Sequence, residues 1–501
     1  MPSSRYQTGK KVALQLSENL AQIRILMAES LDLTLREFEL GNGQRAATLY
    51  IDGLVDMEVL GHDFYAPLQS ADNAKNYSAA ELSQRVISLG SLQVSQDFDQ
   101  VIGAVLQGLT ALFVDGDDHA LLVQAISWQQ RSVAEPGTDV VIRGPREGFI
   151  ESMRVNVSLL RRKIHHPDFT AETLNLGRYS RTDIALVYIK GIVNQDVLTR
   201  LRQRLSEIDI DAILDSGYIE QLVQDTPYSL FPTIGTAEKP DIAAARILEG
   251  RIAILVDGSP VALTVPMLFV EGLHSPEDHY TRFYYATWVR IIRAIAFAIS
   301  LLLPGFFLAA VYYHQQIIPF NLLLSMAAGE SSTPFSTGFS LLLLGLAYEI
   351  LREAGIRLPK PAGQAISIVG AIVMGDAAVS ANLISASVLI VLALTVVAAF
   401  VSATYVDAAT LLRLIFLLLA WGLGFFGMLI GILFLLVYLC SLESFGVPFF
   451  APFAPYDAYG MRDAMVRYPL RRLRFRPYLL SRNRRRMGQT PKTSADSGEK
   501  G

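Results

Sequence analysis

The stretch "LQGLTALFVDGDDHALLV" (Leu106 to Val123) decides the fold of the first half of the chain. It reads as a helix end closed by Gly108, an apolar strand, an Asp-Gly turn and a second apolar strand. Asp-Gly between two runs of apolar residues favours a tight β-hairpin. The sequence therefore predicts a helix followed by a hairpin.

The same pattern occurs a second time, in "LEGRIAILVDGSPVALTV" (Leu248 to Val265). A further pair, "TLYIDGLVD" (Thr48 to Asp56) and "LVYIKGIVN" (Leu186 to Asn194), predicts a strand that leads into an amphipathic helix such as "QDVLTRLRQRLSEI". Both pairs are separated by roughly 140 residues, a spacing typical of an internal repeat. We therefore expect two copies of one α/β unit.

Between the copies, "RGPREGFIESMRVNVSLLRRKI" (Arg143 to Ile164) has a Gly/Pro turn and then a helical pattern with basic residues near its end. We interpret it as a connecting helix with a solvated basic face. The predicted organisation is an N-terminal extension (1–30), a first α/β subdomain (31–135), the connecting helix (136–170), a second α/β subdomain (171–283), a helical transmembrane domain (284–460) and a basic C-terminal tail (461–501).

After Tyr284 the sequence becomes lipid-like. "IIRAIAFAISLLLPGFFLAAVY" (Ile291 to Tyr312) supplies about the 20 apolar residues of a bilayer crossing, and Pro304 kinks or divides it. Further apolar segments are predicted at 338–355, 364–380, 383–403 and 411–442. The last is longer than one straight crossing requires, so it is either one tilted helix or two limbs bent near 422–427. The fold class is thus a tandem-repeat α/β cytoplasmic region plus an all-α polytopic membrane domain with four or six full crossings.

Basic residues orient this domain. From Met461 onward there are twelve Lys or Arg and three Asp or Glu, and Arg282, Arg290 and Arg293 precede the first span. Cytoplasmic flanks of membrane helices are enriched in Lys and Arg. We expect both termini in the cytoplasm and the loop 314–338, which has no Lys or Arg, outside. The N-terminus has no apolar stretch of the kind found in secretory signal peptides.

The sequence patterns that resemble cofactor-binding or metal-binding motifs lack the neighbouring elements or ligand spacing that such sites require. "GLGFFG" (Gly422 to Gly427) matches a dinucleotide-binding pattern but lies in an apolar run without a preceding strand. We interpret Gly422, Gly424, Gly427 and Gly431 as a small-residue face for close helix packing. "VDGDD" (Val114 to Asp118) lacks the ligand spacing of an EF-hand and is predicted to be a hairpin turn. The single cysteine, Cys440, excludes a disulfide framework. No enzyme activity, cofactor, metal or nucleic-acid partner is expected.

Two groups of charged residues in the apolar half are candidate functional sites. Asp376, in "VMGDAAVSAN", is an ionisable residue at membrane depth, which favours a pore or cavity position, although a short segment also lets it reach headgroups or a helix end. Glu349, Arg352 and Glu353 have helical spacing. They form either an ion-pair cluster on a helix surface or a charged ring at the cytoplasmic mouth of a pore.

Several long motifs carry a family resemblance: "RGPREGF", "RTDIALVYIKGI", "YSLFPT", "LEGRIAILVDGSP", "LLLSMAAG", "EILREAGIRLPKPAGQAISIVGAIVMG" and "CSLESFGVPFFAPFAP". From roughly Leu31 to Leu480 the chain resembles the A subunits of GerA-type spore germinant receptors. The resemblance implies a spore inner-membrane protein that acts with a transporter-like, nutrient-sensing B subunit and a lipoprotein C subunit. It further implies self-association as a pentamer into a nutrient-gated cation channel. The related F protein of the stage V sporulation A operon implies an accessory channel-like role as an alternative.

With that resemblance, 364–380 is the predicted pore-lining segment. Ile368, Ile372 and Val379 are the candidate hydrophobic gate positions and Asp376 the cation-attracting group, since apolar constrictions gate by dewetting and acidic rings favour cations. Two other functions are kept open: a secondary transporter, because short Gly-interrupted segments also mark substrate sites, and a scaffold with a membrane anchor. Membrane lipids are expected partners in every case.

Overall fold

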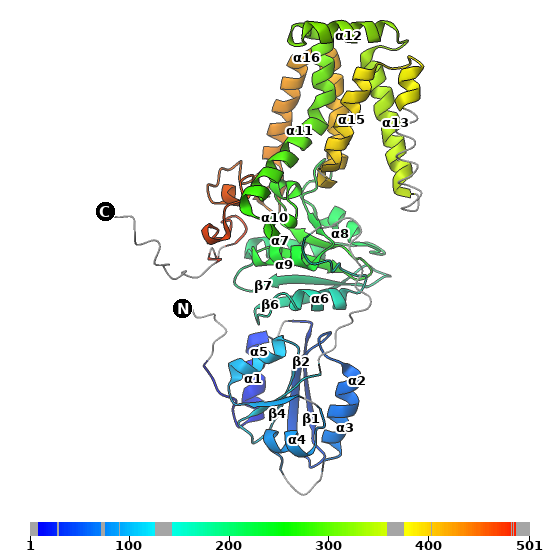
Figure 1. Cartoon of the computed structure of the whole chain (residues 1–501). Coiled ribbons are helices and arrows are strands. Elements are labelled where there is room, and N and C mark those ends of the chain that lie inside the picture. The colour runs from blue at the N-terminus through cyan, green and yellow to red at the C-terminus, as the bar shows by residue number, and fades with distance from the viewer. Residues whose placement is uncertain are drawn as a thin grey trace, which may run out of the picture.

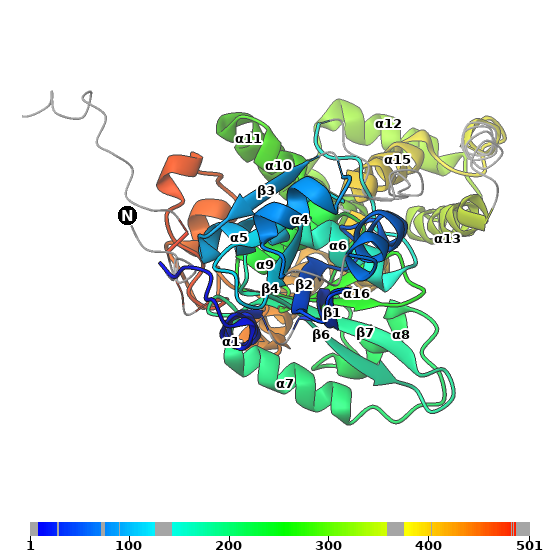
Figure 2. The same ribbon diagram turned by 90° about the horizontal axis from the view of Figure 1, so that it is seen from below.

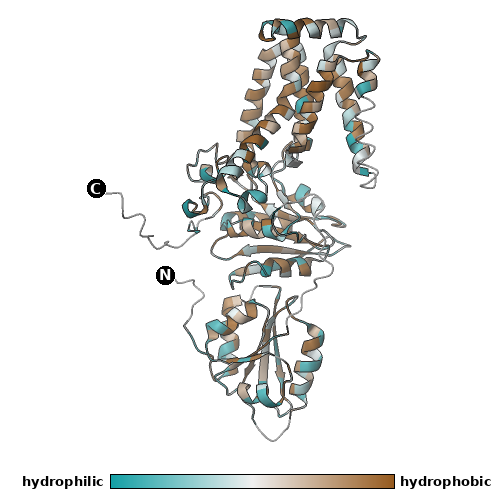
Figure 3. Ribbon diagram, viewed as in Figure 1, coloured by the Kyte–Doolittle hydropathy of each residue, from teal (hydrophilic) through white to brown (hydrophobic). Residues whose placement is uncertain are grey.

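The computed structural model describes residues 9–27, 30–71, 76–89, 91–125, 143–357, 375–401, 403–481, 483, 485 and 486. Two α/β subdomains and a helical region follow one another along the chain, and the C-terminal segment returns to the second subdomain (Figure 1). Hydrophobic residues predominate in the helical region, whereas hydrophilic and hydrophobic residues are mixed in the two subdomains (Figure 3).

The first subdomain is an antiparallel sheet of five strands in the order β1-β2-β4-β5-β3. Its elements are α1 (Leu16–Met27), β1 (Leu33–Glu39), β2 (Arg45–Ile51), α2 (Met57–Val59), η1 (Leu60–Tyr65), α3 (Ala66–Gln69), α4 (Ala79–Arg85), β3 (Leu92–Ser95), α5 (Phe98–Leu106), β4 (Thr110–Val114) and β5 (Ala120–Val123).

Helices cover both faces of this sheet, and β4 shows how. Ala111 and Phe113 pack with α1 and α5 in one core, whereas Leu112 and Val114 pack with η1, α3 and α4 in the other. Successive strand residues point to opposite faces. A strand buried on both sides is therefore apolar at every position, which explains the unbroken run in the opening motif.

The second subdomain repeats the arrangement, with strand order β6-β7-β9-β10-β8. Its elements are α6 (Met153–Arg161), β6 (Phe169–Leu176), β7 (Thr182–Ile189), α7 (Gln195–Ser206), α8 (Ser216–Val223), β8 (Gly235–Ala237), α9 (Pro240–Leu248), β9 (Ile252–Val256) and β10 (Ala262–Val265). Both predicted Asp-Gly hairpins are confirmed, since β4 pairs with β5 and β9 with β10. Gly116 and Gly258 both have a φ of 88°, which favours glycine.

The aspartate of each hairpin turn also holds the helix that precedes its sheet. The Leu16 backbone N–H donates to Asp115 Oδ1 at 2.9 Å, and the Met153 N–H donates to Asp257 Oδ1 at 3.0 Å. Both amides are at helix starts, where an N–H has no partner within the helix. In each of the two repeats, the VDG motif therefore forms the hairpin turn and also caps the N-terminus of a helix.

A second matched contact defines where each repeat begins. Asn19 in α1 bonds both backbone groups of Ala13, and Asn156 in α6 bonds both backbone groups of Ile150. The helix α6, within the predicted connecting segment, is therefore the counterpart of α1 and the first helix of the second repeat. Likewise, α1 lies in the predicted N-terminal extension but packs in the first core.

The helical region contains α11 (Phe283–Tyr313), α12 (Phe320–Ser331), α13 (Thr337–Arg357), a helical turn at 375–380, α15 (Ala386–Val401) and α16 (Val406–Ser441). α11 runs unbroken through Pro304. Within the described ranges, α11 and α16 are long and apolar enough to cross a membrane, and α15 is a shorter apolar helix. α12 lies across the end of the bundle far from the subdomains (Figure 1), and Figure 2 shows α13 set apart from α11 beside α15.

α16 is a helical hairpin. Gly424 leaves the helical conformation with a φ of 61°, and a methyl group at Gly431 would lie 2.8 Å from the Phe416 ring. Such closeness across fifteen residues requires two antiparallel limbs, 406–423 and 425–441. Of the two sequence alternatives, the bend at the glycines is therefore the one observed. The Tyr313 hydroxyl donates to the carbonyls of Trp421 and Gly422, which the break leaves free (2.7 and 3.1 Å).

The C-terminal segment contains β11 (Glu443–Ser444), β12 (Val447–Pro448), η5 (Gly460–Asp463) and η6 (Leu470–Arg472). Leu480 is buried in the core of the second subdomain, and Arg476 Nε donates to the Leu248 carbonyl at 2.6 Å. The predicted basic tail is therefore docked on this subdomain over its described residues.

Candidate functional site at the base of the helical region

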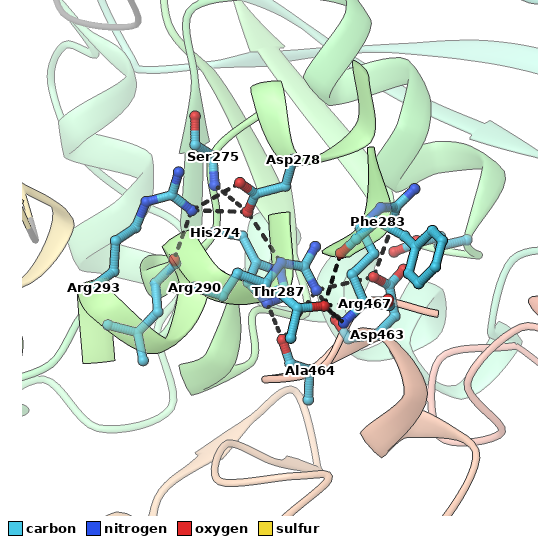
Figure 4. A network of polar contacts seen from close by, with 12 residues as sticks. His274, Ser275, Asp278, Phe283, Thr287, Arg290, Arg293, Asp463, Ala464 and Arg467 are labelled. Atoms are coloured by element: carbon cyan, nitrogen blue, oxygen red, sulfur yellow. Dashed lines mark hydrogen bonds and ion pairs between the residues drawn. The ribbon is translucent and has the colours of Figure 1, made fainter. Parts of the chain in front are cut away.

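A buried ion network joins three parts of the chain where α11 leaves the second subdomain (Figure 4). Arg290, on α11, is 1% exposed. Its Nε donates to Asp278 Oδ2 at 3.0 Å, and its Nη1 donates to Asp463 Oδ1 at 3.0 Å and to the Ala464 carbonyl at 3.0 Å. One guanidinium therefore fixes α11 to α10 (Glu277–Tyr280) and to the C-terminal segment.

Each carboxylate of the network has a second arginine. Arg293 Nη1 bonds both oxygens of Asp278 at 3.0 and 2.8 Å, and Arg467 Nη1 bonds Asp463 at 2.9 Å. The Arg467 backbone N–H also donates to the Thr287 hydroxyl at 3.0 Å. The network is therefore doubly paired at both carboxylates, although Nη2 of Arg290 is buried without a hydrogen-bond partner among the described residues.

The protonation states follow from this setting. Burial opposes ionisation of Asp278 and Asp463, but the hydrogen bonds and charges of the neighbouring arginines prevail and lower the pKa of both carboxyls. Burial and then the charge of Arg290 lower the pKa of His274 to about 3. The imidazole is therefore neutral, and its Nε2–H donates to the Ala464 carbonyl at 2.8 Å.

We call the region where α11 and α16 meet the second subdomain the junction. An aromatic cluster forms its second contact, beside the ion network. The Tyr405 hydroxyl donates to the Phe269 carbonyl at 2.5 Å, and the two rings stack with centroids 5.2 Å apart. Phe231 meets Tyr405 edge-on at 5.4 Å. A methyl group at Gly272 would collide with the Tyr405 ring, so glycine is required there. The turn between α15 and α16 is thus docked on η2 (Phe269–Leu273).

A cavity of about 860 Å³ lies beside both contacts. Its lining includes His274 and Asp463 of the ion network, Phe231 of the aromatic cluster, and Asp407 and Ala408 at the start of α16. The junction therefore has rigid contacts next to free space.

The predicted charged group on α13 takes part in a contact between helices. Glu349 pairs with Arg352 at 2.8 Å and with Arg413 of α16 at 2.6 Å, whereas Glu353 pairs with Arg357 at 2.6 Å. Sequence reasoning missed Arg413. Its signal was present, because it is the single basic residue in the apolar run 406–441.

Two of the four pore candidates lie in the described part of the chain. Asp376 is exposed and Val379 half-buried in the helical turn 375–380. A methyl group at Gly375 would touch Leu389 at 3.3 Å, and Ser385 lies 3.8 Å from the corresponding position on Gly329 of α12. Asp376 is thus near the end of the bundle next to α12. Ile368 and Ile372 lie outside the described residues.

Three of the four glycines predicted to pack helices closely take part in the α16 hairpin, and one does not. Gly424 makes the break, and methyl groups at Gly427 and Gly431 would meet the opposing limb of α16. A methyl group at Gly422 would meet nothing within 4 Å, so Gly422 takes no part in this packing.

In the VDGDD turn, oxygen or nitrogen atoms of Asp117, Asp118 and His119 lie within 4.8 Å of one another. These atoms have protein partners: Asp117 accepts from the Ala79 N–H at 2.5 Å, and His119 Nδ1 lies 2.6 Å from Asp118. The turn therefore serves the local fold.

A tandem α/β module fixed to apolar helices by buried ion pairs defines the class: a membrane-associated protein with a large non-membrane module. The chain belongs to the GerA family, since the model described as "Bacillus/Clostridium GerA spore germination protein" matches residues 21–479. It is 40% identical to spore germination protein KA of Bacillus subtilis (strain 168), over 97% of this chain and 91% of that protein. It is 36% identical to GerLA of Bacillus cereus (94% and 97%) and 34% identical to the uncharacterized membrane protein YfkQ of B. subtilis (96% and 94%).

Among solved structures, the chain matches the N-terminal domain of the A subunit of the Bacillus megaterium spore germinant receptor GerK3. The match has 35% identity and a TM-score of 0.42, and covers 52% of this chain and 98% of that one. The relatives KA and GerLA are spore germination proteins.

Proposed function

We propose that this protein is the membrane subunit of a nutrient germinant receptor in the spore inner membrane. It self-associates as a pentamer and forms a nutrient-gated cation channel, together with a nutrient-sensing B subunit and a lipoprotein C subunit. The observation that carries the proposal is the length of the family match, because residues 21–479 include both α/β subdomains, the helical region and most of the docked C-terminal segment.

We further propose a multi-pass arrangement with both termini in the cytoplasm. The first half of α11 and the end of α16 both lie at the junction with the second subdomain, where Phe297 and Leu439 pack in one cluster. An even number of crossings returns the chain to the side on which it began. The two limbs of α16 are about 27 and 25 Å long at 1.5 Å per residue, slightly less than the roughly 30 Å thickness of the hydrocarbon core. Five of the proposed crossings lie in the described residues, namely α11, α13, α15 and the two limbs of α16, and an even total requires a sixth.

Gating requires a ligand to make different contacts in the closed and open states. In the proposed mechanism, nutrient binding on the partner moves the second subdomain, and the Arg290 network and the Tyr405 contact pass that movement to α11 and α16. Exposed apolar side chains of α13, such as Leu346 and Ile350 (60% and 62% exposed), supply a face for a neighbouring subunit. Asp376 attracts cations, and Ile368, Ile372 and Val379 form the gate.

The test is cation efflux from vesicles reconstituted with this chain, with and without its B and C partners. When all three subunits are present, nutrient should cause K⁺ release, and the conductance should change in unitary steps. Asp376→Ala should lower cation selectivity and Val379→Trp should block efflux, while Asp63→Ala, an exposed carboxylate of the first subdomain, should change neither. Saturating flux without unitary steps would identify a transporter. Undiminished efflux in Val379→Trp and Asp376→Ala would identify a scaffold.

A further inference from the structure

The C-terminal segment passes beside the start of α11 (Figure 1), and several of its basic and apolar residues are exposed there. Arg471, Arg472 and Arg474 are exposed, together with Val466 and Leu470. We call these five residues the basal basic patch. The two apolar residues precede the three arginines along the segment, so the patch combines an apolar part with a cationic part.

The charge of the patch is not compensated. Asp463 is the single acidic residue in the sequence 461–486, and it is already paired with Arg290 and Arg467. Within the described part of the chain, Arg471 and Arg472 have no carboxylate at ion-pair distance. The Arg474 Nε donates to the Arg471 carbonyl at 3.3 Å, a bond that leaves its positive charge intact.

The patch is also fixed in position relative to the proposed membrane. The Arg467–Thr287 bond ties its N-terminal end to the second turn of α11, and the Arg290–Asp463 ion pair ties it one turn further on. On the same helix, Tyr285 and Trp288 are exposed (56% and 61%), just before lipid-like residues begin. Exposed tyrosine and tryptophan at a helix end mark the headgroup level of a bilayer. The patch therefore lies close to that level.

We propose that the basal basic patch binds the headgroups of anionic phospholipids in the leaflet next to the α/β module. This inference rests on the membrane placement proposed above. Arginine pairs with phosphate through two parallel hydrogen bonds, and each basic residue within a Debye length of an anionic surface strengthens binding about five-fold. Val466 and Leu470 contact the acyl boundary. Lipid bound here also holds the segment that carries Asp463, and so stabilises the Arg290 network.

Tryptophan quenching tests the proposal on the full chain. The variant Trp128→Phe/Trp421→Phe keeps Trp288 as its single tryptophan beside the patch. It is reconstituted in phosphatidylcholine vesicles that contain brominated phosphatidylglycerol or brominated phosphatidylcholine. We expect phosphatidylglycerol to be preferred at least ten-fold near Trp288. Adding Arg471→Gln/Arg472→Gln/Arg474→Gln should bring the preference close to one.

Matched controls separate charge at this place from charge in general. Arg24→Gln/Arg85→Gln/Arg154→Gln removes three exposed arginines from the α/β module and should leave the preference unchanged. The three Arg→Lys replacements in the patch should keep most of it, and they also serve as the test if the Gln variant does not reconstitute. A protein with Trp421 alone, near the far end of the bundle, should show no preference.

The outcomes distinguish the two proposals. If neither brominated lipid quenches Trp288, the membrane placement itself is wrong. If both lipids quench it equally, or if the preference survives in the Gln variant of the patch, the membrane placement stands and the lipid site is overturned. Loss of the preference in the control variant would overturn the site as well, since the effect would then follow net charge.

Discussion

Replacing Arg290 by methionine should loosen the junction without unfolding the subdomains. Methionine fills similar volume, but Asp278 and Asp463 each lose one buried cationic partner and the Ala464 carbonyl loses a donor. Breaking a buried ion pair costs about 3 to 5 kcal/mol. Because Arg293 and Arg467 remain on the two carboxylates, we expect the lower end, about 3 kcal/mol.

Amide hydrogen exchange on the full chain in detergent measures this effect locally. The Arg467 N–H, bonded to Thr287 Oγ1, and the Tyr468 N–H, bonded to the Arg462 carbonyl, report on the docked segment. A loss of about 3 kcal/mol makes their exchange roughly 150-fold faster. The amides of β4, in the first subdomain, should be unaffected.

The matched control is Arg282→Met, eight residues earlier on the same side of the junction. Arg282 is exposed and donates to the Tyr284 hydroxyl at 3.1 Å. Exposed substitutions of this kind change stability by about 0.5 kcal/mol or less. The reasoning would be refuted by unchanged exchange in Arg290→Met, or by equal acceleration in both variants.

Three further predictions concern the same junction. Gly272→Ala should destabilise it by about 1 to 3 kcal/mol through collision with Tyr405, and Tyr405→Ala in the same chain should relieve the collision, as thermal unfolding would show. The free energy of unfolding should fall by about 1.6 kcal/mol between pH 6.5 and 5, because unfolded but not folded His274 binds a proton there; His274→Gln should flatten this slope in urea titrations. Glu349→Gln should weaken the α13–α16 contact by about 1 kcal/mol through loss of the half-buried ion pair with Arg413, measured by amide exchange in α13.

The repeat was predictable because it depends on local chemistry. Asp-Gly turns between apolar runs fix two hairpins, and both are present. What the pattern could not show is that the turn aspartates Asp115 and Asp257 also cap α1 and α6, because a cap of this kind joins residues about 100 positions apart. For that reason the sequence pattern alone assigns α1 to an N-terminal extension and α6 to a connecting helix.

The apolar spans were predictable from hydropathy, but hydropathy does not show whether the last span is one straight helix or a hairpin. The glycines of "GLGFFG" allowed a bend without requiring one, and only the packing of Gly431 against Phe416 shows the hairpin. The partner of Glu349 was missed for a similar reason. Arg413 lies on another helix, and helical spacing reports contacts within one helix only.

By itself, the sequence determined the two α/β repeats, the apolar helical half, the basic C-terminal segment and the family, because turn chemistry, periodicity, hydropathy and motifs are local properties of the chain. The tertiary structure alone decided the junction: that Arg290, placed before the first span as an orienting charge, is buried between Asp278 and Asp463, and that Tyr405 is docked on Phe269. The physical reason is that burial and ion pairing depend on which distant segments meet, and a desolvated arginine has the same sequence signature as a solvated one.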